Sequence, residues 1–86
     1  MRTISFLPGA FKDYVEWSVS NREIHDKINE LIKEIQRDPF KGKGKPEPLK
    51  GNNKGSWSRR INLEHRLVYT VTGDSVTIIT CHGHYE

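Results

Sequence analysis

The chain has 86 residues, a formal net charge of +3 and a hydrophobic content of 34%. A chain of this length makes one domain, over residues 1–86, and buries only about 60% of the surface that it exposes on unfolding, so we expect a small core. Its single cysteine excludes a disulfide framework within the chain, and it has neither an apolar run of membrane-spanning length nor a signal-peptide pattern, so we expect a soluble cytoplasmic protein.

The first predicted elements are a strand and a helix. Residues 2–6 alternate polar and apolar side chains, which is typical of a short strand. Pro8 and Gly9 end this strand, and proline suits the first turn of a helix. Apolar side chains then recur at helical spacing, so a first helix is expected after Pro8.

A second helix is indicated by the next segment. Ser20 and Glu23 have the spacing of a capping box, which predicts Ser20 as the N-cap. One stripe of the helix carries the apolar residues Ile24, Ile28, Leu31, Ile32 and Ile35. Pro39 disfavours the helical conformation at Asp38, so the helix should end there.

Residues 40–53 form a predicted loop that is rich in glycine, proline and lysine. Long loops in small domains are usually functional or disordered. Glu47 lies between Pro46 and Pro48, so we interpret it as a carboxylate held in a stiff, extended segment among cations. The alternative is a flexible basic loop in which Glu47 only offsets the neighbouring lysines.

Residues 56–71 predict two antiparallel strands, because strand-forming residues flank a polar turn at positions 62–64. Side chains alternate along the second strand, so Arg66 faces away from its apolar neighbours. Arg59 or Arg60 in the first strand must then share a face with Arg66. Several arginines on one small sheet suggest an anionic ligand, although a solvated sheet face explains one such arginine equally well.

The last segment, residues 76–81, is strongly β-forming and is expected to be a buried central strand. It leads into a tail, residues 82–86, that carries two histidines. The predicted fold is therefore α+β, with two N-terminal helices packed on a small antiparallel sheet. The element order is β-α-α-β-β-β, and the loop at residues 47–51 has room for an extra short strand.

Positive charge is concentrated in the middle of the chain. Residues 37–66 hold nine Lys or Arg against three Asp or Glu, whereas the segments on either side are slightly acidic. Such a concentration indicates a polyanionic partner such as RNA. Lys43 and Lys45, in the predicted loop, are candidate RNA contacts for this reason.

The residue types needed to cleave an RNA phosphodiester without a metal are all present. The reaction needs a base for the 2′-OH proton, a cation for the phosphorane charge and an acid for the departing 5′-oxygen. A carboxylate, an arginine and a histidine can fill these roles, and arginine binds phosphate through paired hydrogen bonds. The candidates are Glu47, Arg66, His84 and Tyr85, with Lys50, Arg59 and Arg60 nearby in the sequence. Their spacing leaves open whether they converge.

Two other kinds of site are less favoured. His82 and His84 lie two residues apart, but a zinc site needs further ligands, and we expect neither a metal nor another cofactor. Cys81 ends the buried strand, where a cysteine usually serves as a small hydrophobic residue and not as a nucleophile. We expect His82 to be structural or solvated.

Several motifs are spread over the whole chain. They are Ala10-Phe11-x-Asp13-Tyr14-x-x-Trp17, Lys27-Ile28-Asn29-x-Leu31-Ile32, Pro39-Phe40-x-Gly42-x-Gly44-Lys45-Pro46-Glu47-Pro48-Leu49-Lys50, Trp57-Ser58-Arg59-Arg60-Ile61, Glu64-His65-Arg66-Leu67-Val68-Tyr69 and Cys81-x-x-His84-Tyr85. Together they resemble the YoeB (Txe/YoeB) toxins, within the wider RelE/ParE superfamily. The resemblance implies a small RelE-like, microbial-ribonuclease-like fold.

The activity implied by this resemblance is that of an mRNA endonuclease in a type II toxin–antitoxin pair. Such toxins act on translating ribosomes, so the implied partners are the ribosome, mRNA and a YefM-type antitoxin protein, with a toxin homodimer as an open option. Carried over by position, the resemblance makes Glu47 the general base, Arg66 the phosphate-stabilising cation and His84 the general acid.

The resemblance also assigns supporting roles. Tyr85 would help to hold the substrate, Lys50 and Arg60 would contact RNA, and Glu64 would lie at the edge of the site. Arg59 remains a candidate RNA contact because of its place in the predicted sheet.

Two residues depart from the family pattern. Gly83 stands where a bulky residue is common before the His-Tyr pair, and it should loosen the tail; Glu86 extends the chain past that tyrosine. Two other functions remain as alternatives. One is a ParE-like gyrase inhibitor, which shares the fold, and the other is a non-catalytic RNA-binding module.

Overall fold

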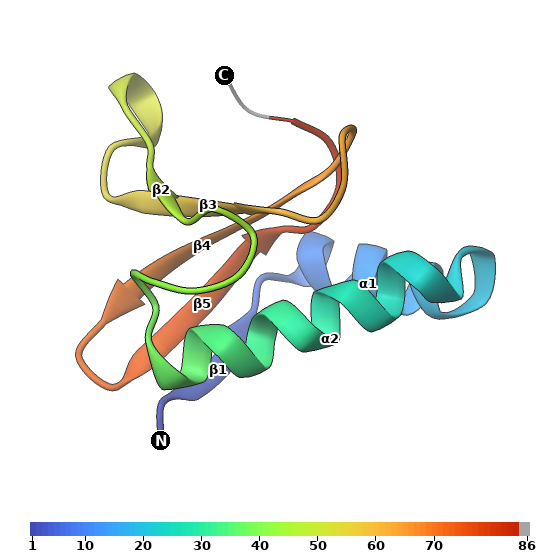
Figure 1. The fold of residues 1–86 in the computed structure, drawn as a ribbon, viewed down its shortest axis with the longest axis horizontal. Helices are drawn as coiled ribbons and strands as arrows, with labels where there is room; N and C mark the ends of the chain where they lie inside the picture. The colour runs from blue at the N-terminus through green and yellow to red at the C-terminus, as the bar shows by residue number, and fades with distance from the viewer. Residues whose placement is uncertain (85–86) are drawn as a thin grey trace.

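The fold is that of a computed structural model, which describes residues 1–84 (Figure 1). The elements in chain order are β1 (Thr3–Phe6), α1 (Pro8–Ser20), α2 (Arg22–Arg37), β2 (Glu47–Pro48), the 3-10 turn η1 (Gly51–Asn53), β3 (Ser56–Arg60), β4 (Arg66–Thr72) and β5 (Ser75–Thr80). The predicted α+β order is confirmed, including the extra short strand in the loop, which is β2. Within residues 1–84, no helix is long and apolar enough to cross a membrane.

The five strands form one sheet in the order β1-β5-β4-β3-β2. Strands β2 to β5 pair antiparallel, as predicted, whereas β1 joins the sheet parallel to β5. The sheet is therefore mixed. Its first strand pairs with the last one and not with the next strand in the sequence. This arrangement places β5 between β1 and β4, which confirms that residues 76–81 supply an interior strand.

Only one residue, Asn21, separates the two helices. Pro8 occupies the start of α1, as the sequence predicts. The prediction of Ser20 as the N-cap of α2 is wrong, because Ser20 still belongs to α1 and its Oγ donates to the carbonyl of Glu16 at 3.0 Å. Asn21 has the extended backbone between the helices, and its Oδ1 accepts the Ile24 N–H at 3.2 Å. Asp38 caps the C-terminus of α2, at the predicted stop.

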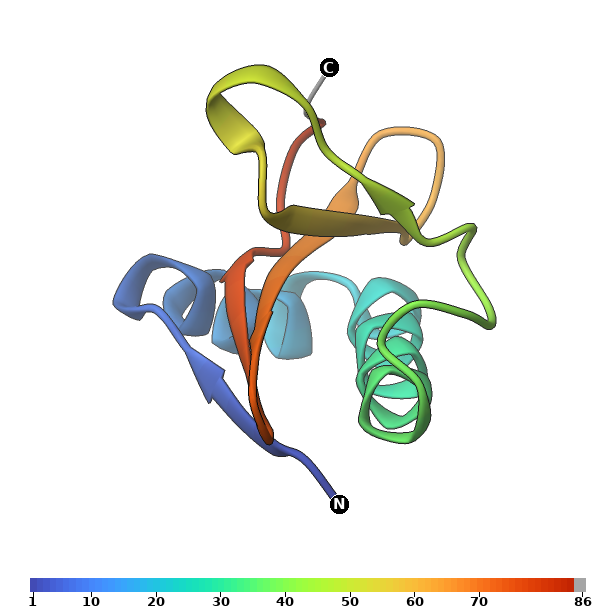
Figure 2. The same cartoon turned by 90° about the vertical axis from the view of Figure 1, so that its left-hand side faces the viewer.

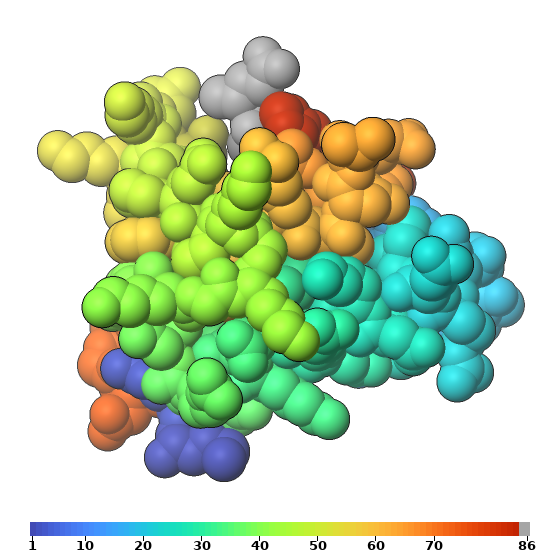
Figure 3. Space-filling model, viewed as in Figure 1, coloured from blue at the N-terminus to red at the C-terminus, as the bar shows by residue number. Residues whose placement is uncertain are grey.

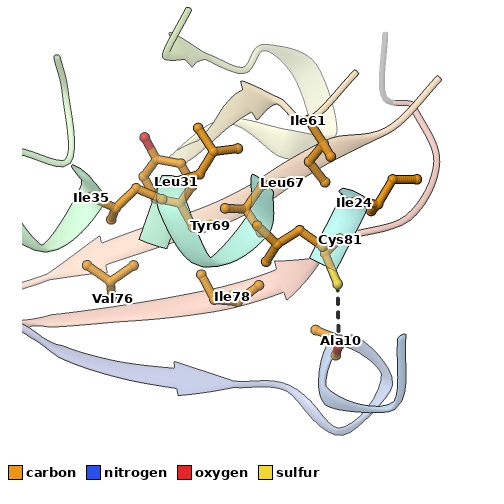
Figure 4. Packing of buried hydrophobic residues seen from close by; sticks show 11 residues of the cluster. Ala10, Ile24, Leu31, Ile35, Ile61, Leu67, Tyr69, Val76, Ile78 and Cys81 are labelled. Atoms are coloured by element: carbon orange, nitrogen blue, oxygen red, sulfur yellow. Dashed lines mark hydrogen bonds between the residues drawn. The ribbon is translucent and has the colours of Figure 1, made fainter. Parts of the chain in front are cut away.

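The core lies between the helices and one face of the sheet, and both helices lie on the same side of it (Figure 2). Helix α2 contributes Ile24, Ile28, Leu31 and Ile35, all buried, with Ile32 partly buried beside them. Leu67 and Tyr69 of β4, and Val76 and Ile78 of β5, meet them from the sheet (Figure 4). The apolar stripe of α2 is therefore core, as predicted.

A buried arginine connects the loop after α2 to the sheet. Arg59 of β3 has a relative exposure of 0%. Its Nη1 donates to the carbonyl of Lys43 at 3.0 Å, and its Nη2 donates to the carbonyls of Asp38 and Lys41 at 2.7 and 2.9 Å. Its Nε donates to the hydroxyl of Tyr69 at 3.0 Å. A buried charge is tolerated only when its polar atoms are paired, and here backbone carbonyls do most of the pairing.

The same loop makes a close approach to the sheet at Gly44. A Cβ built there would lie 2.9 Å from Leu31 Cδ2 and 3.1 Å from Arg59 Cβ, and φ is +85°. Only glycine fits this position without strain. The carbonyl of Gly44 also accepts the Arg60 N–H at 2.6 Å. The segment from α2 to β2 is therefore fixed along β3, and it is not a flexible basic loop.

Replacing Arg59 with methionine should lower the free energy of unfolding by about 3 kcal/mol or more, because the carbonyls that it satisfies lose a charged donor. Urea unfolding followed by circular dichroism measures this loss. The matched control is Arg60→Met, at the exposed neighbouring position, which should change stability by about 0.5 kcal/mol or less. Equal effects at the two positions would contradict the structural role of Arg59.

Candidate functional site

The candidate site lies on the sheet face that points away from the helices. Side chains alternate along β3, so Arg60 points away from Arg59 and from the core. The register pairs Glu47 with Ser58 and Arg60 with Arg66. Residues paired across strands lie on the same face. Glu47, Arg60 and Arg66 therefore share one face, which answers the question of which β3 arginine accompanies Arg66.

A small cavity opens on this face, with a volume of about 160 Å³. It is lined by Lys45, Glu47, Leu49, Ser58, Arg60, Arg66 and His84. The lining brings together the predicted base, cation and acid, which are Glu47, Arg66 and His84. Two further predicted RNA contacts, Lys45 and Arg60, line it as well, so three cations surround one carboxylate and one imidazole.

The position of Arg66 depends on the turn between β3 and β4. Its Nη1 donates to the carbonyls of Asn62 and His65 at 2.7 and 3.2 Å. Asn62 holds this turn, because its Oδ1 accepts the N–H groups of Glu64 and His65 at 2.9 and 2.8 Å. Arg66 is half-buried, its guanidinium is held by the carbonyls of the turn, and its side chain also lines the cavity.

The backbone turns sharply at Lys45, two residues before Glu47. Lys45 has a φ of 50°, in the left-handed region that is uncommon for a residue other than glycine. Strain of this kind is often found at functional sites. Pro46 and Pro48 then keep the chain extended, and Glu47 and Pro48 pair with β3 as an edge strand. The predicted extended setting of Glu47 is confirmed.

The imidazole of His84 reaches the site on the segment that follows β5. Figure 3 shows this segment, in red, against the turn between β3 and β4, in orange. The N–H of Gly83 donates to His65 Nδ1 at 2.9 Å, and the carbonyl of Gly83 accepts the Arg66 N–H at 2.8 Å. Gly83 itself is therefore bonded to the end of the β3–β4 turn, and whether it loosens the rest of the tail stays a prediction. Its φ of +89° suits glycine, and both of its backbone polar groups are paired.

Several predicted site residues lie elsewhere. Arg59 as an RNA contact is wrong, because its side chain is buried and bonded to the protein's own carbonyls. Lys43 pairs with Glu30 of α2, with Nζ and Oε1 2.7 Å apart. Lys50 and Glu64 are exposed but do not line the cavity. Tyr85 and Glu86 lie outside the described residues.

Cys81 and His82 have structural environments. The thiol of Cys81 is fully buried beside the carbonyl of Ala10 (Figure 4), and burial together with the charge of Asp13 raises its pKa to about 12. A thiol with this pKa is a poor nucleophile. His82 is predicted to be structural or solvated; it is exposed, and its ring stacks on Trp17 with centroids 5.5 Å apart. Within residues 1–84, no three metal-binding side chains come together.

Sequence reasoning missed His65. Its ring contacts Trp17 and His82, with centroids 5.0 and 4.7 Å away, and its Nδ1 accepts the bond from Gly83. No local pattern identifies such a residue, because its partners come from α1 and from the end of the chain. The burial of Arg59, in contrast, had a signal in the alternation of Trp57, Arg59 and Ile61 along one strand face.

Known proteins resemble this chain along most of its length. Residues 6–85 match the family model of the YoeB-like toxin of bacterial type II toxin–antitoxin systems. Toxin YoeB of Escherichia coli (strain K12) is 58% identical over 76 residues, which are 88% of this chain and 90% of that protein.

Two solved structures from Staphylococcus aureus show the same fold. The YoeB dimer has a TM-score of 0.91 and 48% sequence identity, and covers 98% of each chain. The YoeB–YefM complex has a TM-score of 0.90 and 49% identity, and covers 99% of each chain. These matches support the resemblance that the sequence motifs indicated.

Proposed function

Since this chain belongs to the YoeB-like toxins of bacterial type II toxin–antitoxin systems, we propose that it is a ribosome-dependent mRNA endonuclease that inhibits translation in the cytoplasm. The observation that carries the proposal is the shared cavity of Glu47, Arg66 and His84. These residues come from three separate parts of the chain, so their meeting is not a consequence of local sequence. They are also the residue types that metal-independent RNA cleavage needs.

The proposed reaction is an in-line attack by the 2′-oxygen on the adjacent phosphorus. Glu47 removes the 2′-OH proton, and the new P–O bond closes a 2′,3′-cyclic phosphate. His84 gives a proton to the 5′-oxygen as its bond to phosphorus breaks. Both proton transfers are general acid–base steps, and each typically contributes about 10²–10⁴-fold to the rate.

Cations around the cavity stabilise the phosphorane in this proposal. Arg66 is the main one, because its guanidinium is fixed by the turn at Asn62 and aimed along the same face as Glu47. Arg60 and Lys45 add positive charge from the two sides. Preorganised cations of this kind act on the charge that develops in the transition state. Tyr85 would help to hold the substrate, Lys50 would contact RNA outside the cavity, and Glu64 would lie at the edge of the site.

The proposal predicts the effect of single substitutions on mRNA cleavage in a translation reaction, measured by primer extension. Glu47→Gln, Arg66→Ala and His84→Gln should each lower cleavage by about 10²–10⁴-fold. Glu16→Gln and Arg22→Ala remove the same charges from exposed positions on the helices, and should leave cleavage unchanged.

Two other outcomes would replace the proposal. If the protein blocks DNA supercoiling by gyrase and cuts no mRNA, it is a ParE-like inhibitor. If the unsubstituted protein and His84→Gln inhibit translation equally and neither cuts mRNA, the protein is an RNA-binding module.

We also propose a YefM-type antitoxin as the protein partner. The Staphylococcus aureus relative has been solved in complex with YefM. On this chain, Lys45, Arg60 and Arg66 give an acidic antitoxin segment a cluster of cations to cover. A toxin homodimer is the other assembly that we propose, because a relative forms a dimer and α1 exposes apolar side chains at Phe11, Val15 and Val19.

Antitoxin binding should stabilise the toxin, since a ligand that binds only the folded state raises its stability. With antitoxin at about 100 times its Kd, the melting temperature should rise by about 10 °C or more. The double substitution Lys45→Ala and Arg60→Ala should reduce this rise, whereas Arg22→Ala should preserve it. Differential scanning calorimetry measures the shift, and an unchanged melting temperature would contradict the stabilising role.

A further inference from the structure

The segment that carries His84 is attached to the rest of the molecule at successive residues. The indole Nε1 of Trp17 donates to the carbonyl of Cys81 at 3.0 Å. The ring of His82 then stacks on the same indole. These contacts fix the point at which the chain leaves β5, but they lie two or three residues before His84.

The last fixed point before His84 is the backbone of Gly83. Its N–H donates to His65 Nδ1 at 2.9 Å, and its carbonyl accepts the Arg66 N–H at 2.8 Å. His65 is the residue before β4 and Arg66 is its first residue, so Gly83 is bonded to the segment that also positions the Arg66 guanidinium. We call this pair of bonds the Gly83 clasp.

The imidazole of His65 is itself well fixed. Its ring contacts Trp17 and His82, which are stacked on one another, and its backbone N–H donates to Asn62 Oδ1 at 2.8 Å. Nδ1 can accept the Gly83 N–H only when it carries no proton, so the neutral ring must carry its proton on Nε2. A protonated ring would place two donors against each other and break this half of the clasp.

We propose that the neutral imidazole of His65 is a positioning residue, which holds the Gly83 peptide so that His84 faces Arg66 and Glu47. The proposal rests on the function proposed above, and adds a residue that acts on the reaction only through His84. It also makes the site sensitive to the protonation of His65.

The surroundings of His65 favour its neutral form. Burial lowers the pKa of His65 and the charge of His82 lowers it further, while Glu64 raises it. Helix α1 presents the uncharged indole of Trp17, and β4 presents Arg66, whose guanidinium bonds to the His65 carbonyl. Because the folded-state pKa lies below the ordinary value of about 6.5, the clasp is complete above that pH. It is lost as the pH falls through the folded-state pKa.

The test compares His65→Asn with His65→Ala. The Oδ1 of asparagine lies near the position of Nδ1 and can accept the Gly83 N–H, but it does not titrate. His65→Ala should lower kcat for mRNA cleavage by about 10- to 100-fold, because a displacement of about 1 Å can cost that much. KM should change little, since the cations that bind RNA remain. His65→Asn should restore most of the loss.

The pH dependence separates positioning from a merely structural role. The ratio of the His65→Asn rate to the unsubstituted rate should rise as the pH falls below about 6.5 and through the lowered folded-state pKa of His65, since only the unsubstituted clasp opens. Ionisations that are independent of His65 are common to both proteins and cancel in this ratio. A ratio that stays constant with pH would overturn the proposal.

A second measurement does not depend on cleavage. In NMR spectra of the full chain at neutral pH, His65 Nδ1 should be unprotonated and the Gly83 amide should exchange slowly with solvent. His65→Asn should keep this protection, and His65→Ala or acidic pH should remove it. A Gly83 amide that exchanges equally fast in all three proteins would overturn the clasp. If the clasp forms but the unsubstituted protein cuts no mRNA, the proposed function fails and the inference about catalysis fails with it.

Discussion

The buried guanidinium of Arg59 is the interaction on which the rest of the site depends. Its donors reach the carbonyls of Asp38, Lys41 and Lys43, and together they hold the segment after α2 along β3. The hydroxyl of Tyr69 completes the arrangement, because it accepts from Arg59 and donates to the carbonyl of Pro39 at 2.6 Å. Burial raises the pKa of Tyr69, so this hydroxyl keeps its proton and can donate. Together with the bond from the Arg60 N–H to the Gly44 carbonyl, this network holds the segment that leads into β2, where Glu47 is paired opposite Ser58.

The adjacent residues Arg59 and Arg60 therefore have different roles. Arg59 is inside and organises the backbone, and Arg60 is outside and adds charge to the cavity. The difference arises from strand alternation alone, which sends neighbouring side chains to opposite faces. The tail adds His84 to the site, and its Gly83 backbone is bonded to His65 and Arg66, where β4 begins. The loop is thus bonded to β3 and the tail to the start of β4, and these two strands form the hairpin that carries Arg60 and Arg66.

Much of this could be read from the sequence, for identifiable reasons. The stripe of α2, the stop at Asp38 and the hairpin at positions 62–64 are local patterns, and local patterns were sufficient. The N-cap was misplaced because Ser20 and Asn21 are both good capping residues, and only the direct junction of the helices decides between them. The burial of Arg59 and the role of His65 depend on contacts between segments far apart in the chain. The place of Arg59 among several arginines in the predicted sheet favoured an RNA contact, whereas its side chain is buried and makes four hydrogen bonds to the loop and to Tyr69.

The most direct test of the central claim, that Glu47, Arg66 and His84 act on one phosphate, uses an mRNA with sulfur in place of the 5′-oxygen at the cleaved bond. Thiolate is a good leaving group and needs no proton from a general acid, whereas the 2′-OH still needs a base. The account predicts that the rate defect of His84→Gln largely disappears on this substrate, while the defect of Glu47→Gln persists. A His84→Gln defect of equal size on the oxygen and sulfur substrates would contradict it.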